Sequence, residues 1–142
     1  MYRTLLNALS PAGREARLSI LIFHRVLPQA DPLFPEEVDA ARFDAQCRWI
    51  REWFRVLPLD EAAMQLREGR LPARALAITF DDGYADNHDV AMPLLQKHGL
   101  TATFFVATGF LDGGRMWNDT VIEAVRRAPA GPFSPFLNLP ES

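Results

Sequence analysis

Three features of the 142-residue sequence predict an α/β fold in which parallel strands alternate with crossover helices. Short apolar runs of strand type recur along the chain, segments with helical apolar spacing separate them, and Gly, Pro or Asp stands at most of the joints. Strands that alternate with helices pair in parallel through right-handed crossovers. Four such strands with four helices correspond to half of a (β/α) barrel.

The first half of the chain predicts two strands joined by one long helix. An apolar run predicts a strand over 18–26, and three prolines indicate a loop over 28–35. Apolar residues at helical spacing predict an amphipathic helix over 39–54, with Asp39 as its N-cap. A short strand is expected at 56–57.

The second half of the chain continues the alternation. The expected elements are, in order, a helix over 59–69, a strand over 76–80, a helix over 86–98, a strand over 101–107 and a helix over 118–127. Pro93 interrupts the helix over 86–98. Because proline fits best in the first turn of a helix, we expect a kink or a restart at Met92.

The composition is ordinary for a globular domain, with 49% hydrophobic residues and a net charge of -3. Acidic and basic residues are interspersed, so no basic patch indicates nucleic-acid binding. The single cysteine, Cys47, excludes an internal disulfide and is expected to be a small buried residue. The chain contains no transmembrane run, and its N-terminal apolar cluster is too short for a signal peptide, so a cytoplasmic location is the default expectation.

Two adjacent carboxylates, Asp81 and Asp82, follow the apolar strand over 76–80 and precede Gly83. Ionisable groups at the end of a buried strand are costly unless something uses them. Because adjacent strand residues point to opposite sides, one carboxylate could hold a divalent metal while the other takes a proton from water. The pattern therefore indicates metal-assisted hydrolysis.

The segment Thr79-Phe80-Asp81-Asp82-Gly83 resembles the first motif of the polysaccharide deacetylases, carbohydrate esterase family 4. Three other segments are similar to parts of this family, the last of them to a segment of exopolysaccharide-linked members: Leu21-Ile22-Phe23-His24-Arg25-Val26, Thr101-Ala102-Thr103-Phe104-Phe105-Val106 and Met116-Trp117-Asn118-Asp119. The resemblance runs from about Leu18 to about Arg127. It implies the N-terminal half of a distorted (β/α) barrel with its active site at the carboxyl ends of the strands.

The resemblance implies a role for each matched residue. Asp81 would be the catalytic general base, and Asp82 would be a ligand of a divalent metal, usually zinc. His24 and Trp117 would belong to the substrate-binding site. The implied reaction is hydrolysis of a carbon–nitrogen, non-peptide bond, in which acetyl groups are removed from a polysaccharide in carbohydrate metabolism.

The chain departs from the family at the second motif, His-(Ser/Thr)-x-x-His, which supplies two metal-binding imidazoles. The three histidines of this chain, His24, His88 and His98, do not form that pattern. A catalytic zinc needs about three protein ligands, so we expect an incomplete metal site and a truncated chain that is inactive alone. The missing C-terminal half or another chain would have to complete the barrel and cover its open strand edges.

Other interpretations of the same residues remain. A non-catalytic remnant that binds glycan or a partner is the alternative to an enzyme. Asp82-Gly83 is also a common turn dipeptide, and Trp117 is equally well a buried anchor for the helix after it. A calcium loop is excluded because Met92 stands where the twelfth-position Glu should be. A haloacid dehalogenase-type phosphatase is disfavoured because its two Asp residues are two apart rather than adjacent.

The chain is divided on these grounds into three parts. Residues 1–16 are an N-terminal extension, 17–127 a partial polysaccharide deacetylase domain, and 128–142 a Pro-rich tail. The implied partner is an acetylated polysaccharide, with no nucleic acid and no membrane-spanning segment.

Overall fold

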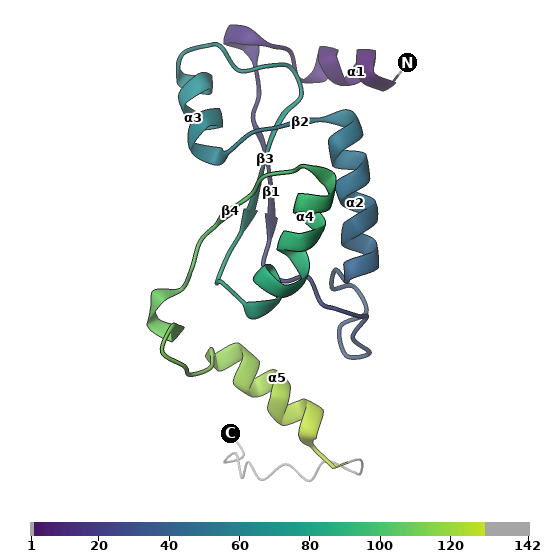
Figure 1. Cartoon of the computed structure of the whole chain (residues 1–142), viewed down its shortest axis with the longest axis vertical. Helices are drawn as coiled ribbons and strands as arrows, with labels where there is room; N and C mark the ends of the chain where they lie inside the picture. The colour runs from purple at the N-terminus through teal and green to yellow at the C-terminus, as the bar shows by residue number, and fades with distance from the viewer. Residues whose placement is uncertain (1, 130–142) are drawn as a thin grey trace, which may run out of the picture. The chain divides into compact units, whose positions relative to one another are not determined.

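The computed structural model describes residues 2–129, which fall into two compact units that divide after Thr108. The first unit contains most of the secondary structure (Figure 1), namely α1 (Tyr2–Leu9), η1 (Gly13–Glu15), β1 (Ser19–Phe23), α2 (Ala40–Trp53), β2 (Arg55–Val56), α3 (Leu59–Arg67), β3 (Ala75–Phe80), η2 (Asn87–Ala91), α4 (Met92–His98) and β4 (Thr103–Phe104). The short helix η3 (Thr108–Phe110) lies at the division, and α5 (Trp117–Arg127) belongs to the second unit. The predicted tail 128–142 lies outside the described residues except for 128 and 129.

The four strands form one parallel sheet with β3 at its centre. On one side β1 pairs with β3 along its whole length, up to the pair Phe23 and Phe80. On the other side β2 pairs with the start of β3 and β4 with its end. The parallel pairing and the alternation of strands with helices confirm the predicted fold class.

Two strands are shorter than the sequence predicts. β1 ends at Phe23 instead of continuing to 26, because the next residues turn toward a carboxylate on another segment. β4 covers Thr103–Phe104 rather than 101–107, because its partner β3 ends at Phe80. Strand length is set here by the neighbouring segments, whereas strand position follows from the apolar runs.

The helices begin and end largely where the sequence signals lie. Asp39 caps α2 by accepting a hydrogen bond from the backbone N–H of Arg42 at 2.8 Å. The helix around Pro93 restarts as expected, since a π-helical segment, η2, leads into α4 at Met92. Gly99 ends α4 in the left-handed conformation, at a φ of 62°. The N-terminal helix α1 is not predicted by the sequence patterns.

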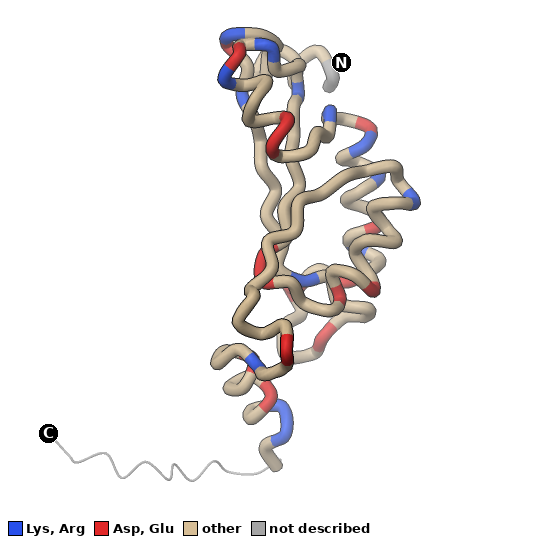
Figure 2. The backbone as a smooth tube through the Cα atoms, turned by 60° about the vertical axis from the view of Figure 1, so that its left-hand side comes forward, with Lys and Arg blue, Asp and Glu red and all other residues tan. Residues whose placement is uncertain are grey.

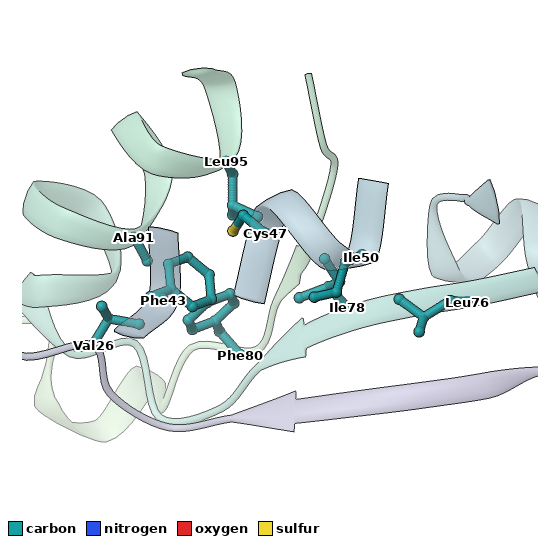
Figure 3. Close-up of a cluster of buried hydrophobic side chains, with 9 residues drawn as sticks. All are labelled: Val26, Phe43, Cys47, Ile50, Leu76, Ile78, Phe80, Ala91 and Leu95. Atoms are coloured by element: carbon teal, nitrogen blue, oxygen red, sulfur yellow. The ribbon is translucent and has the colours of Figure 1, made fainter. Parts of the chain in front are cut away.

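The hydrophobic core lies between β3 and the helices α2 and α4, which pack side by side against one face of the sheet (Figures 1 and 3). Its nine buried residues come from β3, α2, the η2–α4 segment and the chain after β1: Val26, Phe43, Cys47, Ile50, Leu76, Ile78, Phe80, Ala91 and Leu95. Phe80 is its centre, with ring centroids 4.9 Å from Phe104 and 5.3 Å from Phe23. Burial raises the pKa of the Cys47 thiol to about 11, which confirms the predicted buried cysteine.

The outer strand β1 is much less covered than β3. Ile20 is 47% exposed and Ile22 is 61% exposed, although both belong to an apolar run. Within the described residues β1 pairs with β3 alone, so its other edge carries no strand. An exposed apolar edge strand of this kind favours pairing with another segment or chain.

Charged residues of both signs are scattered over helices and loops, while the central strands are nearly free of them (Figure 2). Among residues 2–129, none of the helices has the length and apolar character needed to cross a membrane.

Candidate active site

The candidate site lies at the carboxyl end of β3. All six residues of β3 are buried, and the chain emerges from the sheet at Asp81, which is partly exposed. The backbone N–H of Asp81 donates a hydrogen bond to the carbonyl oxygen of Phe23 at 2.9 Å. The end of β3 is therefore fixed to the end of β1, and Asp81 extends from a rigid base.

The turn after Asp81 has a strained backbone. Asp82 has a φ of 72° and Gly83 a φ of 73°, so two consecutive residues adopt the left-handed conformation. The turn is held to the segment after β4 by a hydrogen bond from the N–H of Ala107 to the carbonyl of Asp82 at 3.2 Å. A Cβ at Gly83 would lie 2.9 Å from Cγ1 of Val106, so no larger residue fits. Strain of this kind is often found at functional sites.

His24 reaches the same edge of the sheet from β1. It directly follows Phe23, as Asp81 directly follows Phe80, and these two phenylalanines are register partners. The structure thus brings His24, Asp81 and Asp82 to the carboxyl edge of two adjacent parallel strands, which is where the fold places active sites. No hydrogen bond or ion pair within the described part of the chain joins the three side chains.

An ion pair between Arg25 and Asp86 lies beside these residues, and the sequence patterns do not predict it. Nε and Nη2 of Arg25 each lie 2.8 Å from Oδ2 of Asp86, whose side chain is only 8% exposed. The backbone N–H of Val26 donates to Oδ1 of Asp86 at 3.4 Å, and the Arg25 guanidinium lies over the ring of Tyr84 at 4.6 Å. In the sequence, Arg25 could be noticed because it follows His24, but this adjacency does not identify Asp86 as its partner.

Asn87 is another buried polar residue near the turn, and unlike Asp86 its side chain has no hydrogen-bond partner among residues 2–129. Asn87 begins the π-helical segment η2, and its side chain is buried. Neither atom of its amide has a hydrogen-bond partner among residues 2–129. A buried polar group without a partner costs about 1–3 kcal/mol, and π-helical turns occur frequently at functional sites. The segment after the Asp pair therefore combines backbone strain with an unpaired polar group.

The described residues do not complete a metal site. A catalytic zinc needs about three protein ligands, and no group of three or more His, Cys, Asp or Glu side chains in residues 2–129 is arranged to hold an ion. His98 contacts Asp44, with Nε2 2.9 Å from Oδ1, and the exposed His88 contacts Asp89. These contacts give both histidines acidic partners on the helical segments, and Asp82 remains a single candidate ligand.

Trp117 is not joined to the other candidate residues by the structure. It is the first residue of α5 in the second unit, and its side chain is 81% exposed. The alternative that Trp117 is a buried anchor for this helix is therefore wrong. Its role in substrate binding stays a prediction.

The family model described as polysaccharide deacetylase matches residues 68–129 of this chain. YxkH of Bacillus subtilis, provisionally named a polysaccharide deacetylase, is 33% identical over 95 residues, or 66% of this chain and 33% of YxkH. The poly-beta-1,6-N-acetyl-D-glucosamine N-deacetylase of Staphylococcus aureus is 32% identical over 73 residues, or 51% of this chain and 25% of that enzyme. The chain thus spans a third or less of the length of these curated relatives.

Solved structures give the same picture. The Streptococcus pyogenes deacetylase PplD, determined in complex with acetate, is 26% identical with a TM-score of 0.61, covering 77% of this chain and 52% of that one. IcaB from Ammonifex degensii is 26% identical with a TM-score of 0.57, covering 82% of this chain and 50% of that one. The sheet and helices described above are therefore part of the β/α barrel fold of these proteins.

Proposed function

We propose that this chain carries part of a polysaccharide deacetylase domain and that the role of this domain is the hydrolytic removal of acetyl groups from an acetylated polysaccharide. The observation that carries the proposal is the Asp81–Asp82 pair on a strained turn at the carboxyl end of a fully buried strand. The reaction belongs to the hydrolases that act on carbon–nitrogen, non-peptide bonds.

Asp81 is the general base in this proposal. Its carboxylate accepts a proton as a water oxygen attacks the acetyl carbonyl, and a tetrahedral intermediate forms. Collapse of the intermediate breaks the carbon–nitrogen bond, the amine takes up a proton, and acetate leaves. The fixed end of β3 holds the Asp81 backbone in place, which keeps the base oriented during the reaction.

Asp82 is proposed as one ligand of a divalent metal, with zinc as the metal that the family resemblance implies. The residues described here do not provide the remaining ligands, so no step of the reaction is derived through the metal. Residues outside 2–129 must therefore complete the metal site before the domain can deacetylate its substrate.

We place His24 in the substrate-binding region because it shares the strand edge with Asp81. Trp117 is proposed as a sugar-stacking residue on the basis of its exposed indole. The Staphylococcus aureus relative is named for an N-acetylated glucosamine polymer, which supports an exopolysaccharide as the substrate.

The exposed edge of β1 is proposed as the place where further strands complete the barrel. Ile20 and Ile22 are exposed there, and no strand among the described residues covers them. The covering strands would come from the rest of the domain or from another chain.

The first test is calorimetric titration of the purified chain with Zn²⁺, together with acetate release from poly-N-acetylglucosamine. We expect weak Zn²⁺ binding that Asp82→Asn abolishes and Asp81→Asn retains. We expect acetate release no faster than that of the variant carrying both substitutions. Binding that is unchanged by Asp82→Asn would contradict the ligand assignment.

Acetate release that exceeds the double variant and depends on metal would instead contradict the requirement for further residues. The alternative function is a glycan- or partner-binding remnant without catalysis, and it is favoured by the lack of a three-ligand group among the described residues. Binding of poly-N-acetylglucosamine in the presence of EDTA, with the same affinity in the double variant, would support that alternative.

A further inference from the structure

The Arg25–Asp86 pair joins the two chain segments that carry the candidate site. Arg25 lies in the turn after β1, next to His24, and Asp86 lies four residues after Asp82. A backbone hydrogen bond from the N–H of Asp81 to the carbonyl oxygen of Phe23 also connects the two segments.

The contacts of the Arg25–Asp86 pair fix the orientation of both side chains as well as neutralise their charges. The Asp86 carboxylate is nearly buried and takes hydrogen bonds from a side chain and from the Val26 backbone. The planar guanidinium of Arg25 is held from a second direction by the Tyr84 ring at 4.6 Å. Charge-assisted hydrogen bonds with little exposure to water keep a fixed orientation better than an ion pair on the surface.

We propose that Arg25 and Asp86 are positioning residues that hold the His24 turn against the Asp81–Asp82 turn. The pair acts through the backbone on both sides: Arg25 and Val26 fix the chain that leaves β1, and Asp86 fixes the chain that leaves β3. The catalytic meaning of this arrangement rests on the proposed function, whereas the coupling between the two turns is a property of the chain itself.

The test measures coupling between His24 and Asp81 by NMR at a fixed pH. The chain has three histidines, so the Hε1 resonance of His24 is assigned by comparison with His24→Gln. Asp81→Asn removes a charge beside His24 and is expected to shift this resonance. In the Asp86→Asn background we expect the response to Asp81→Asn to fall by more than half, because the side-chain connection between the two segments is weakened and the backbone bond from Asp81 to Phe23 fixes only the strand ends.

Asp89→Asn is the matched control, because Asp89 lies on the same segment, is exposed and contacts His88 instead. The response of His24 should persist in that background. Arg25→Lys keeps the charge but loses the planar fork, and we expect an intermediate response. It also serves as the second variant if Asp86→Asn does not fold, as judged by circular dichroism.

An unchanged His24 response in folded Asp86→Asn or Arg25→Lys would overturn the positioning role and assign the pair to stability alone. This result is separate from the function itself, since the NMR response requires neither metal nor activity. If Zn²⁺ binding is unchanged by Asp82→Asn while the coupling depends on Asp86, the ligand assignment in the proposed function fails and the positioning role stands.

Discussion

The strands β1 and β3 are direct neighbours with almost the same chemistry and opposite surroundings. Both are apolar runs, and they pair residue by residue from Ser19 and Leu76 to Phe23 and Phe80. Yet every residue of β3 is buried, whereas four of the five residues of β1 are exposed. β3 has partners on both sides and helices over one face, and the candidate site follows this strand. The two candidate carboxylates therefore follow the strand with partners on both sides, whereas His24 follows the strand that has an open edge among residues 2–129.

The largest expected effect on stability comes from truncating one apolar side chain in each of the two strands. Phe80→Ala removes the ring at the centre of the core and is expected to cost about 3–5 kcal/mol of unfolding free energy. Ile22→Ala, at a site that is 61% exposed, is expected to cost about 0.5 kcal/mol. Urea denaturation followed by circular dichroism measures both, and equal losses would mean that β1 is covered in solution.

The turn that leaves β3 is expected to be less tolerant than the turn that ends α4. Gly83→Ala combines a positive φ with a contact of 2.9 Å to Val106, and we expect a loss of about 3 kcal/mol. Gly99 has a similar φ but no atom within 4 Å of an added Cβ, so Gly99→Ala should cost only about 1 kcal/mol. Thermal unfolding of the two variants compares them directly. A similar loss of unfolding free energy at both sites would show that the segment around Val106 moves easily to make room for the added Cβ.

The helices that cover β3 are expected to lose a connection in acid. Hydrogen bonds from Lys97 and then His98 lower the pKa of Asp44, which joins α2 to α4, from 3.8 to about 2. A lowered pKa stabilises the fold above the ordinary value, and this contribution is lost as the pH falls from about 4 to about 2.

Urea midpoints of the unsubstituted chain and Asp44→Asn at pH 7, 4 and 2.5 measure this loss. The difference between the two midpoints should be nearly constant from pH 7 to 4 and should narrow toward pH 2.5. Asp60→Asn, on the exposed side of α3, is the control and should show no such narrowing. A difference that persists at pH 2.5 would rule out the Asp44 connection as its source.

The smallest effect on stability is expected from charging the open edge. Ile22→Lys should change the unfolding free energy by about 0.5 kcal/mol at most, because the side chain is exposed. Lysine on an edge strand discourages pairing with another chain, so we expect less self-association at high concentration. Sedimentation velocity measures this self-association. If Ile22→Lys leaves it unaltered, the contact between chains does not involve the edge of β1.

The sequence predicts this fold well where the signals are local. The cap at Asp39, the restart at Met92 and the helix end at His98 each depend on neighbouring residues and are confirmed. The lengths of β1 and β4 depend on what lies beside them, and there the predictions are wrong. The sequence analysis does not predict the helix α1, whose residues Leu5 and Leu9 are exposed.

The site shows the same division. The position of Asp81 and Asp82 at the end of a buried strand can be predicted, because the apolar run and the two carboxylates are contiguous. The pairing of Arg25 with Asp86 joins positions 61 residues apart, and no local pattern identifies one as the partner of the other. The left-handed φ of Asp82 occurs together with a hydrogen bond from Ala107, 25 positions away in the sequence, and no local pattern predicts either feature.

The close approach of Gly83 to Val106 also limits the order in which substitutions can accumulate. Shortening Val106 to alanine would remove the Cγ1 contact at 2.9 Å, but its Cα would still lie 3.2 Å from an added Cβ. The positive φ at position 83 would remain as well. No single preceding change therefore opens position 83 to a larger residue. The turn and the segment after β4 are expected to diverge together, as a coupled unit, in any lineage that keeps this site.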